Sequence, residues 1–148
     1  MKLSKKSEYG VRALVEIALR SQAGSEWHQI SQIADTTRIP EKFLEQILLV
    51  MKNGGLLKSR RGIEGGYALN TAPEQIHLDQ IVALLDGFGQ TEGGSTAGMD
   101  DTSRVFHSLV AEAQTAAQAV LQKVTLSRLV AQVRVLRSST NESLEYHI

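Results

Sequence analysis

The sequence predicts a mainly α-helical fold with a small β-hairpin wing, in which a winged helix-turn-helix domain precedes a long C-terminal dimerisation helix. Three observations support this fold class. Two helix-length segments with apolar residues at three- and four-residue steps are separated by a short turn. A glycine-rich, basic hairpin follows them directly. A further apolar stripe at helical spacing runs through the last third of the chain.

The bulk composition is that of a folded globular protein. In 148 residues, 42% are hydrophobic and 22% charged, which suits one domain with an appended helix. No apolar run is long enough for a membrane span, and the start MKLSKKSEYG lacks the apolar core of a leader, so we expect a cytoplasmic protein without membrane contact. The absence of cysteine excludes disulfides and thiolate ligands within this sequence.

The net charge of zero conceals an asymmetry between the two halves of the chain. Residues 1–70 hold 11 Lys and Arg against 7 Asp and Glu, whereas residues 71–148 hold 5 against 9. A basic front half suits a module that meets a polyanion with one face. Chance variation in solvated charges is the alternative interpretation.

The helix-turn-helix segment is expected in the first third of the chain. The first helix runs from an N-cap at Ser4 to about Arg20, and Ser31 is the expected cap of a second helix that continues through Thr36. Pro40 suits the first position of the third helix, which Asn53-Gly54-Gly55 ends. The apolar face of this third helix is expected to consist of Phe43, Leu44, Ile47, Leu48 and Met51.

A β-hairpin is expected next, with strands at 56–60 and 67–69 around the tip Arg61-Gly62-Ile63-Glu64-Gly65-Gly66. A short helix at 78–85 follows Pro73, and residues 86–102 contain five glycines without an apolar period, which indicates a loop. Thr125 is the expected cap of a last helix. These features divide the chain into a DNA-binding domain (1–72), a linking helix with an effector-type loop (73–102), dimerisation helices (103–137) and a polar tail (138–148).

The third helix carries the candidate base contacts, because the second helix of a helix-turn-helix pair enters the major groove of DNA. Carboxylates accept from cytosine, Gln pairs with adenine, and Lys reaches guanine or phosphate. An ordinary solvated helix face is the alternative. The candidates on this helix are Glu41, Lys42, Glu45 and Gln46, and Ser31 on the preceding helix joins them.

The hairpin is the second candidate contact with DNA. Arginine favours a narrow, electronegative minor groove, and glycines permit a tight turn and a close backbone approach. A surface hairpin with two stray arginines is the alternative. The candidates here are Ser59, Arg60, Arg61, Gly62 and Tyr67.

The apolar stripe of the last third is expected to form a homodimer interface, because a small domain leaves such a stripe exposed unless a second copy covers it. Packing against the first helix of the same chain is the alternative. A two-fold dimer would bind a palindromic site. The stripe consists of Val105, Leu109, Ala113, Ala116, Val120 and Val124.

Catalysis has no support in the sequence. The GxSxG, HExxH and P-loop motifs are missing, and the four histidines are scattered. Glu92, Asp100 and Asp101 in the long loop offer carboxylates to a cation, but acidic residues in a loop are more often only solubilising. We therefore expect no enzyme and no metal site.

Five segments resemble the Rrf-two family of bacterial regulators, the group of IscR, NsrR and CymR. They are LSKKSEYGVRALVEIA, IPEKFLEQIL, SRRGIEGGYALN, HLDQIVALLDG and VTLSRLV, and the resemblance extends to about residue 136. It implies a homodimeric winged-helix repressor or activator with a long crossed dimerisation helix, and repression is the expected direction of control. It also places Lys42 and Glu45 at recognition-helix positions and Arg61 at the position of a minor-groove arginine.

The resemblance fails at the cofactor. Cluster-binding members of the family carry three cysteines before a residue that corresponds to His107, and the matching positions here are Arg104, Gly98 and Glu92. Glu8 falls where some relatives have an acidic ligand. Iron–sulfur clusters depend on thiolates, so we expect no cluster.

The leading hypothesis is a cluster-free DNA-binding regulator controlled by a small molecule or a protein partner. A metal-responsive regulator with His and carboxylate ligands is one alternative. A winged-helix module that binds protein instead of DNA is the other, and the basic hairpin argues against it.

Overall fold

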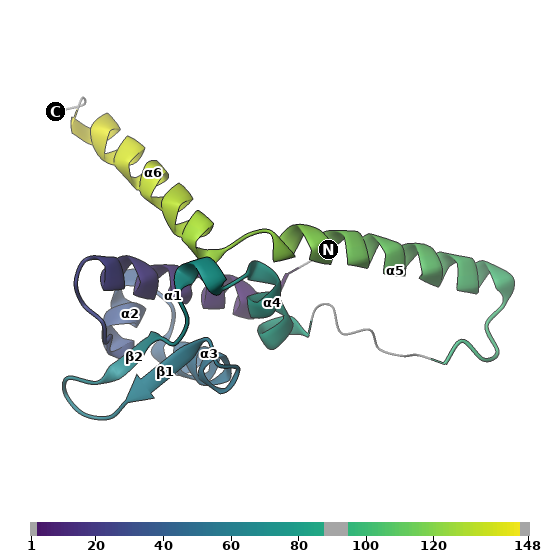
Figure 1. The fold of residues 1–148 in the computed structure, drawn as a ribbon, viewed down its shortest axis with the longest axis horizontal. Helices are drawn as coiled ribbons and strands as arrows, with labels where there is room; N and C mark the ends of the chain where they lie inside the picture. The colour runs from purple at the N-terminus through teal and green to yellow at the C-terminus, as the bar shows by residue number, and fades with distance from the viewer. Residues whose placement is uncertain (1–2, 88–94, 146–148) are drawn as a thin grey trace.

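The computed structural model describes residues 3–87 and 95–145. Figure 1 shows a body made of the first four helices and the hairpin, with α5 and α6 extending from it in different directions. This arrangement confirms the predicted winged helix-turn-helix fold class. The elements in order are α1 (Lys5–Gln22), α2 (Ile30–Thr37), α3 (Glu41–Asn53), β1 (Leu57–Arg60), β2 (Gly66–Leu69), the 3-10 turn η1 (Pro73–Gln75), α4 (Leu78–Asp86), α5 (Asp101–Gln122) and α6 (Leu126–Glu145).

The start of α1 is capped as predicted. The backbone N–H of Ser7 donates to Ser4 Oγ at 3.2 Å, which satisfies one of the unpaired amides of the first turn. The Ser7 hydroxyl also donates to Asp86 at 2.5 Å, and the Ser4 hydroxyl donates to the same carboxylate. The end of α4 is thereby tied to the start of α1.

The start of α2 corrects the expected cap at Ser31. The helix begins at Ile30 with Gln29 as its N-cap, and Ser31 is an exposed residue of the first turn. The reason is a side-chain contact: Gln32 Oε1 accepts the backbone N–H of Gln29 at 3.1 Å, which sets the helix boundary two residues earlier than Ser31.

The start of α3 needs two corrections. Pro40 is the N-cap and precedes the first helical residue, Glu41, and its carbonyl accepts from Leu44 N at 2.9 Å. Phe43 belongs to the rim of the apolar face, because it is 38% exposed and packs edge-on against Tyr9 at 5.6 Å between ring centroids. The other four predicted residues of this face are buried: Leu44, Ile47, Leu48 and Met51.

One hydrophobic core extends across the expected domain boundary at residue 72. It combines the buried faces of α1, α2 and α3 with residues of α4 and the first turns of α6. The start of α6 therefore packs on the winged domain, and the members after residue 72 are Ile76, Ile81, Leu85, Leu126 and Val130.

The C-terminal helices differ from the prediction at their junction. Val124 lies beyond the end of α5 and is half-buried, and its carbonyl accepts from Leu78 N at 2.9 Å, so it does not continue the α5 stripe. Thr125 caps α6 as predicted, because its hydroxyl accepts from Arg128 N at 3.2 Å. The segment expected as a polar tail from residue 138 is helical as far as Glu145.

An ion-paired cluster joins α6 to α1. The Glu16 carboxylate is 8% exposed and lies 3.1 Å from Arg20 Nε and 3.7 Å from the guanidinium of Arg137. Two cations compensate this buried charge, as burial of a carboxylate requires. Among residues 3–87 and 95–145, no helix combines the length and apolar character that a membrane crossing needs.

Candidate nucleic-acid interface

The outer face of α3 presents four polar side chains opposite the core. All four candidates predicted on this helix are exposed: Glu41, Lys42, Glu45 and Gln46. Their positions follow from the helix period, because Leu44, Ile47 and Leu48 occupy the buried side. Their donors and acceptors are consequently available to the edges of bases.

A cluster that the sequence analysis missed borders this face. The Tyr9 ring on α1 contacts Phe43 on α3 edge-on, and Arg12 lies 5.6 Å from the centre of the Tyr9 ring. The guanidinium of Arg12 also donates to the carbonyl of Thr37 at the end of α2. Tyr9 and Arg12 are one turn apart on α1, so helical spacing was the available signal.

The hairpin consists of two strands of four residues, and β2 is hydrogen-bonded to the segment before α2. Strands β1 and β2 are antiparallel with Leu57 opposite Leu69 and Arg60 opposite Gly66. Tyr67 and His28 exchange both backbone hydrogen bonds, at 2.9 and 2.8 Å, which adds residue 28 to the edge of β2. Gly66 has φ +121°, and a Cβ there would overlap the His28 carbonyl, so a side chain at this position is excluded.

Charged groups on α1 and α3 affect the pKa values of His28, beside the hairpin, and of Tyr67 within it. Burial of the Tyr67 ring raises the pKa of its hydroxyl, and the negative charge of Glu45 on α3 raises it further. Burial lowers the pKa of His28, and the charge of Arg20 lowers it in addition. The carboxylate of Glu45 on α3 therefore lies within electrostatic range of the hairpin.

The cations of the hairpin are not equivalent. Lys58 Nζ and the Arg60 guanidinium lie 5.2 and 4.5 Å from the centre of the Trp27 ring. Lys58 also pairs with Glu26 at 3.1 Å, and Arg60 Nη2 donates to the carbonyl of Glu64 at 2.6 Å. Both cations are thus held against one face of the hairpin.

Arg61 stands apart from that group. It is exposed, and within residues 3–87 and 95–145 its side chain makes no hydrogen bond or ion pair. Ser59 and Gly62, the other candidates beside it, are exposed as well. The structure therefore leaves Arg61 as the hairpin arginine whose charge is available to a partner.

The apolar stripe of α5 is exposed along nearly its whole length. Val105, Leu109 and Val120 are 60%, 59% and 64% exposed, and Ala113 and Ala116 are exposed as well. Figure 1 shows α5 projecting away from the winged body. The alternative of packing against the first helix applies to α6 and does not apply to this stripe.

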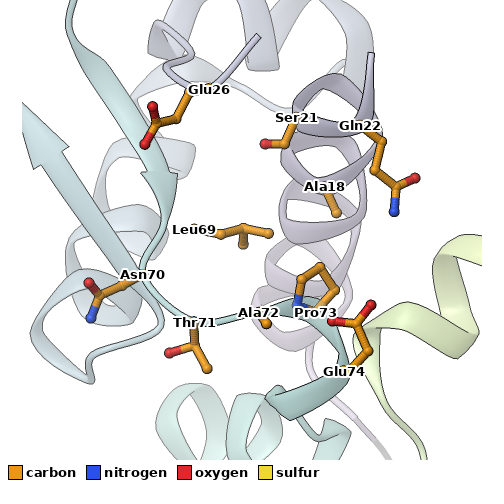
Figure 2. Close-up of a pocket in the computed structure, with 10 residues that line it drawn as sticks. All are labelled: Ala18, Ser21, Gln22, Glu26, Leu69, Asn70, Thr71, Ala72, Pro73 and Glu74. Atoms are coloured by element: carbon orange, nitrogen blue, oxygen red, sulfur yellow. The ribbon is translucent and has the colours of Figure 1, made fainter. Parts of the chain in front are cut away.

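A hollow of about 470 Å³ lies between the C-terminal end of α1 and the connection from β2 to η1 (Figure 2). Its lining is mixed, with the polar residues Ser21 and Gln22 on one side and Asn70 and Thr71 on the other. A smaller pocket of about 230 Å³ lies under α6, between α1 and the end of α2, and includes Arg12, Glu16 and Arg137.

The donor set does not fit an iron–sulfur cluster. No residue of the sequence supplies a thiolate, and the described part of the chain holds no group of three or more His, Asp or Glu side chains that could ligate a metal ion. Glu8 instead faces Lys5 at 3.3 Å. Gly98 and Arg104 offer no anionic ligand, and Glu92 lies outside the described residues.

Comparison with known proteins gives consistent results. The family model Rrf2, described as an iron-dependent transcriptional regulator, matches residues 3–132. The chain is 41% identical to the slr0846 protein of Synechocystis over 86 residues, and 37% identical to the HTH-type transcriptional regulator CymR of Bacillus subtilis over 87 residues. These matches cover 58% and 59% of this chain but only 57% and 62% of those relatives, less than two thirds of either.

Solved structures extend the likeness to most of the chain. The structure of CymR, the global cysteine regulator of B. subtilis, superposes with a TM-score of 0.73 at 30% identity, covering 89% of this chain and 98% of CymR. The IscR structure from T. potens gives 0.68 at 28% identity, covering 90% and 88%. The chain therefore belongs to the Rrf2 family of transcriptional regulators.

Proposed function

We propose that this protein is a sequence-specific, DNA-binding transcriptional regulator of the cytoplasm, with no catalytic role, that acts as a homodimer without an iron–sulfur cluster. The observation that carries the proposal is the juxtaposition of an exposed polar face on α3 with a hairpin whose Arg61 is uncommitted. In this arrangement α3 enters the major groove and the hairpin reaches the adjacent minor groove. Membership of a family of transcriptional regulators supports it.

The residue roles follow from the available donors and acceptors. Lys42, Glu45 and Gln46 contact base edges, with Glu41 and Ser31 at the border of the contact. Arg61 enters the minor groove, and Ser59 and Gly62 approach the backbone. Arg60 is held by Trp27 and Glu64 and stabilises the hairpin on the side of the Trp27 ring, and the Tyr67 hydroxyl lies within electrostatic range of Glu45.

The dimer completes the site. The stripe from Val105 to Val120 covers itself against the same helix of a second copy, which removes apolar surface from water and creates a two-fold axis. The operator is then palindromic, with half-sites about one helical turn or a multiple of it apart. Repression is the proposed direction of control.

Selection from a pool of random duplexes tests this function. The protein is incubated with the pool at moderate salt, and bound duplexes are amplified and sequenced over several rounds. Enrichment of a palindromic motif, with affinity that falls steeply as salt rises, is the expected result. A pool that stays random after selection would refute sequence-specific binding.

Control by a small molecule is a second part of the proposal. The pocket under α6 lies between this helix and helices α1 and α2 of the winged body, so a ligand bound there would contact both parts of the chain. The lining of this pocket holds two cations, Arg12 and Arg137, and one carboxylate, Glu16, which pairs with Arg137. The excess of one positive charge favours a small carboxylate. Melting temperatures are measured with a series of small carboxylic acids, and a rise that the Arg137→Ala variant loses is expected; no rise in any case would remove this pocket from consideration.

A further inference from the structure

We propose that Gln29 is the positioning residue of the hairpin: its side-chain amide holds the hairpin tip in the conformation that presents Arg61 to DNA. The proposal rests on the DNA-binding function argued above and deepens it. It concerns a residue of the segment before α2, outside both DNA-contacting elements.

The geometry is a convergence of backbone carbonyls on one nitrogen. Gln29 Nε2 lies 3.1 Å from the carbonyl oxygen of Gly62, 2.9 Å from that of Ile63 and 3.0 Å from that of Gly65. The amide group has two hydrogens, so the three acceptors share them in bifurcated bonds. A single side chain thereby binds three backbone carbonyls of the turn.

Two further contacts close the same turn. The backbone N–H of Gly65 donates to the carbonyl of Gly62 at 3.1 Å, and Arg60 Nη2 donates to the carbonyl of Glu64. A Cβ at Gly65 would overlap the carbonyl of Arg60, so the tip is wound too tightly for a side chain at that position. With the carbonyls engaged on the inside, Ile63 remains 97% exposed and Arg61 is exposed on the outside.

Gln29 is itself held in place. Its backbone N–H donates to Gln32 Oε1, and the preceding residue His28 is joined to Tyr67 by two backbone hydrogen bonds. The anchor of the tip is therefore the start of α2, the first helix of the helix-turn-helix pair. The hairpin and that helix pair are connected through Gln29 at the tip as well as through the strands at the base.

The energetic consequence concerns the free protein. A tip with three glycines within residues 62–66 has many conformations available when it is not held, and ordering it on DNA would cost affinity. The Gln29 amide orders the tip when the chain folds, so the tip does not have to be ordered when DNA binds. A weakened anchor is therefore expected to reduce affinity through Arg61, while the contacts of α3 with DNA are retained.

The test compares two isosteric charge variants. Gln29→Glu removes both donors and points a carboxylate at three carbonyls. Gln32→Glu adds the same charge one turn away and keeps the oxygen that accepts from Gln29, so it is the matched control. Affinity is measured by fluorescence anisotropy with a labelled duplex recovered from the selection, and each variant is also made in the Arg61→Ala background.

The expected result is a loss of about tenfold or more in affinity for Gln29→Glu, against about threefold or less for Gln32→Glu. In the Arg61→Ala background, Gln29→Glu is expected to cost less than about twofold, because the residue that it positions is gone. A general loss of structure would not produce this non-additivity. Gln29→Ala repeats the cycle without an added charge, should the Glu variant fold poorly.

Amide hydrogen exchange of the free protein provides the second readout. Faster exchange at Gly65 is expected in Gln29→Glu and Gln29→Ala, with unchanged exchange in the middle of α3. Equal affinities of the Gln29→Glu and Gln32→Glu variants, or a full loss that persists without Arg61, would overturn the proposal. If the unaltered protein selected no duplex, the proposed function would fail, while the exchange rates would still decide whether Gln29 holds the tip.

Discussion

The winged body and helix α5 differ in how far their apolar side chains are exposed. In the body, Leu14, Ile47 and Leu48 are fully or almost fully buried, and neighbouring elements of the same chain cover them. On α5, Val105, Leu109 and Val120 are each at least 59% exposed. The body is buried within one chain, whereas the described residues of the chain leave the apolar face of α5 uncovered. Changes in the two regions should therefore affect different measurements.

The largest effect is expected for a cavity in the body. Leu48→Ala removes a fully buried side chain from α3 and should lower the free energy of unfolding by about 2–5 kcal/mol. Urea unfolding followed by circular dichroism measures this change, and Leu109→Ala is the matched control on α5, since it creates no cavity within the chain. Equal losses for the two variants, at a concentration where both are monomeric, would contradict the comparison.

The second effect is on assembly. Leu109→Asp places a charge in the middle of the α5 stripe and should weaken dimerisation at least about tenfold, because the carboxylate would be desolvated in the interface. Sedimentation velocity over a range of concentrations gives the dissociation constant, and circular dichroism checks that the body remains folded. A variant that stays dimeric at the lowest concentration would show that α5 is not the interface.

The helix order, the hairpin and the Ser4 and Thr125 caps were predictable because they depend on residues close together in the sequence. Gln29 is different: it is bonded to carbonyls 33 to 36 residues away, and no local pattern encodes such a contact. Ser31 is the expected cap of α2 because a hydroxyl is a common cap, whereas Gln at the N-cap position is not a local signal for the start of a helix. Long-range side-chain contacts were thus the part that sequence could not supply.

The difference between Arg60 and Arg61 has a signal in the local sequence. Side chains two residues apart on a strand share a face, so Lys58 and Arg60 lie on one side of β1, where Trp27 binds both. Arg61 is the next residue after Arg60, so its side chain is expected on the opposite face, and it is exposed. The identity of Trp27 as the partner still required the fold, because the segment before α2 reaches β2 only through the His28–Tyr67 bridge.

The third prediction uses that difference within the hairpin. Arg61→Ala should cost about 1–3 kcal/mol in DNA binding, because the proposed function places this arginine in the minor groove. Arg60→Ala is the matched control, because it removes the same charge from a residue held by Trp27 and Glu64. It should lower DNA affinity less than Arg61→Ala does, and it should leave the hairpin tip less well ordered. Anisotropy titrations at two salt concentrations separate the two. A larger loss of affinity for Arg60→Ala would show that Arg60, and not Arg61, makes the groove contact.

The smallest effect is expected from pH. It arises from His28, which is buried in the body, whereas His107 on α5 is exposed. His28 is 1% exposed, and burial followed by the charge of Arg20 lowers its pKa below 6.5, although nearby Glu16 opposes the shift. The unfolded chain therefore binds a proton more readily than the folded one. This contribution to stability is complete above the unfolded pKa of 6.5 and is lost as pH falls towards the lowered folded value.

The measurement is the melting temperature between about pH 7.5 and about pH 5.5, a range in which few other side chains titrate. The unaltered protein should lose stability over this range, and His28→Gln should show a flatter profile even if it is less stable throughout. His107→Gln on the exposed part of α5 is the control and should keep the slope of the unaltered protein. If the His28 variant kept that slope instead, the loss would come from groups elsewhere, and the closed packing of the body around residue 28 would not be its cause.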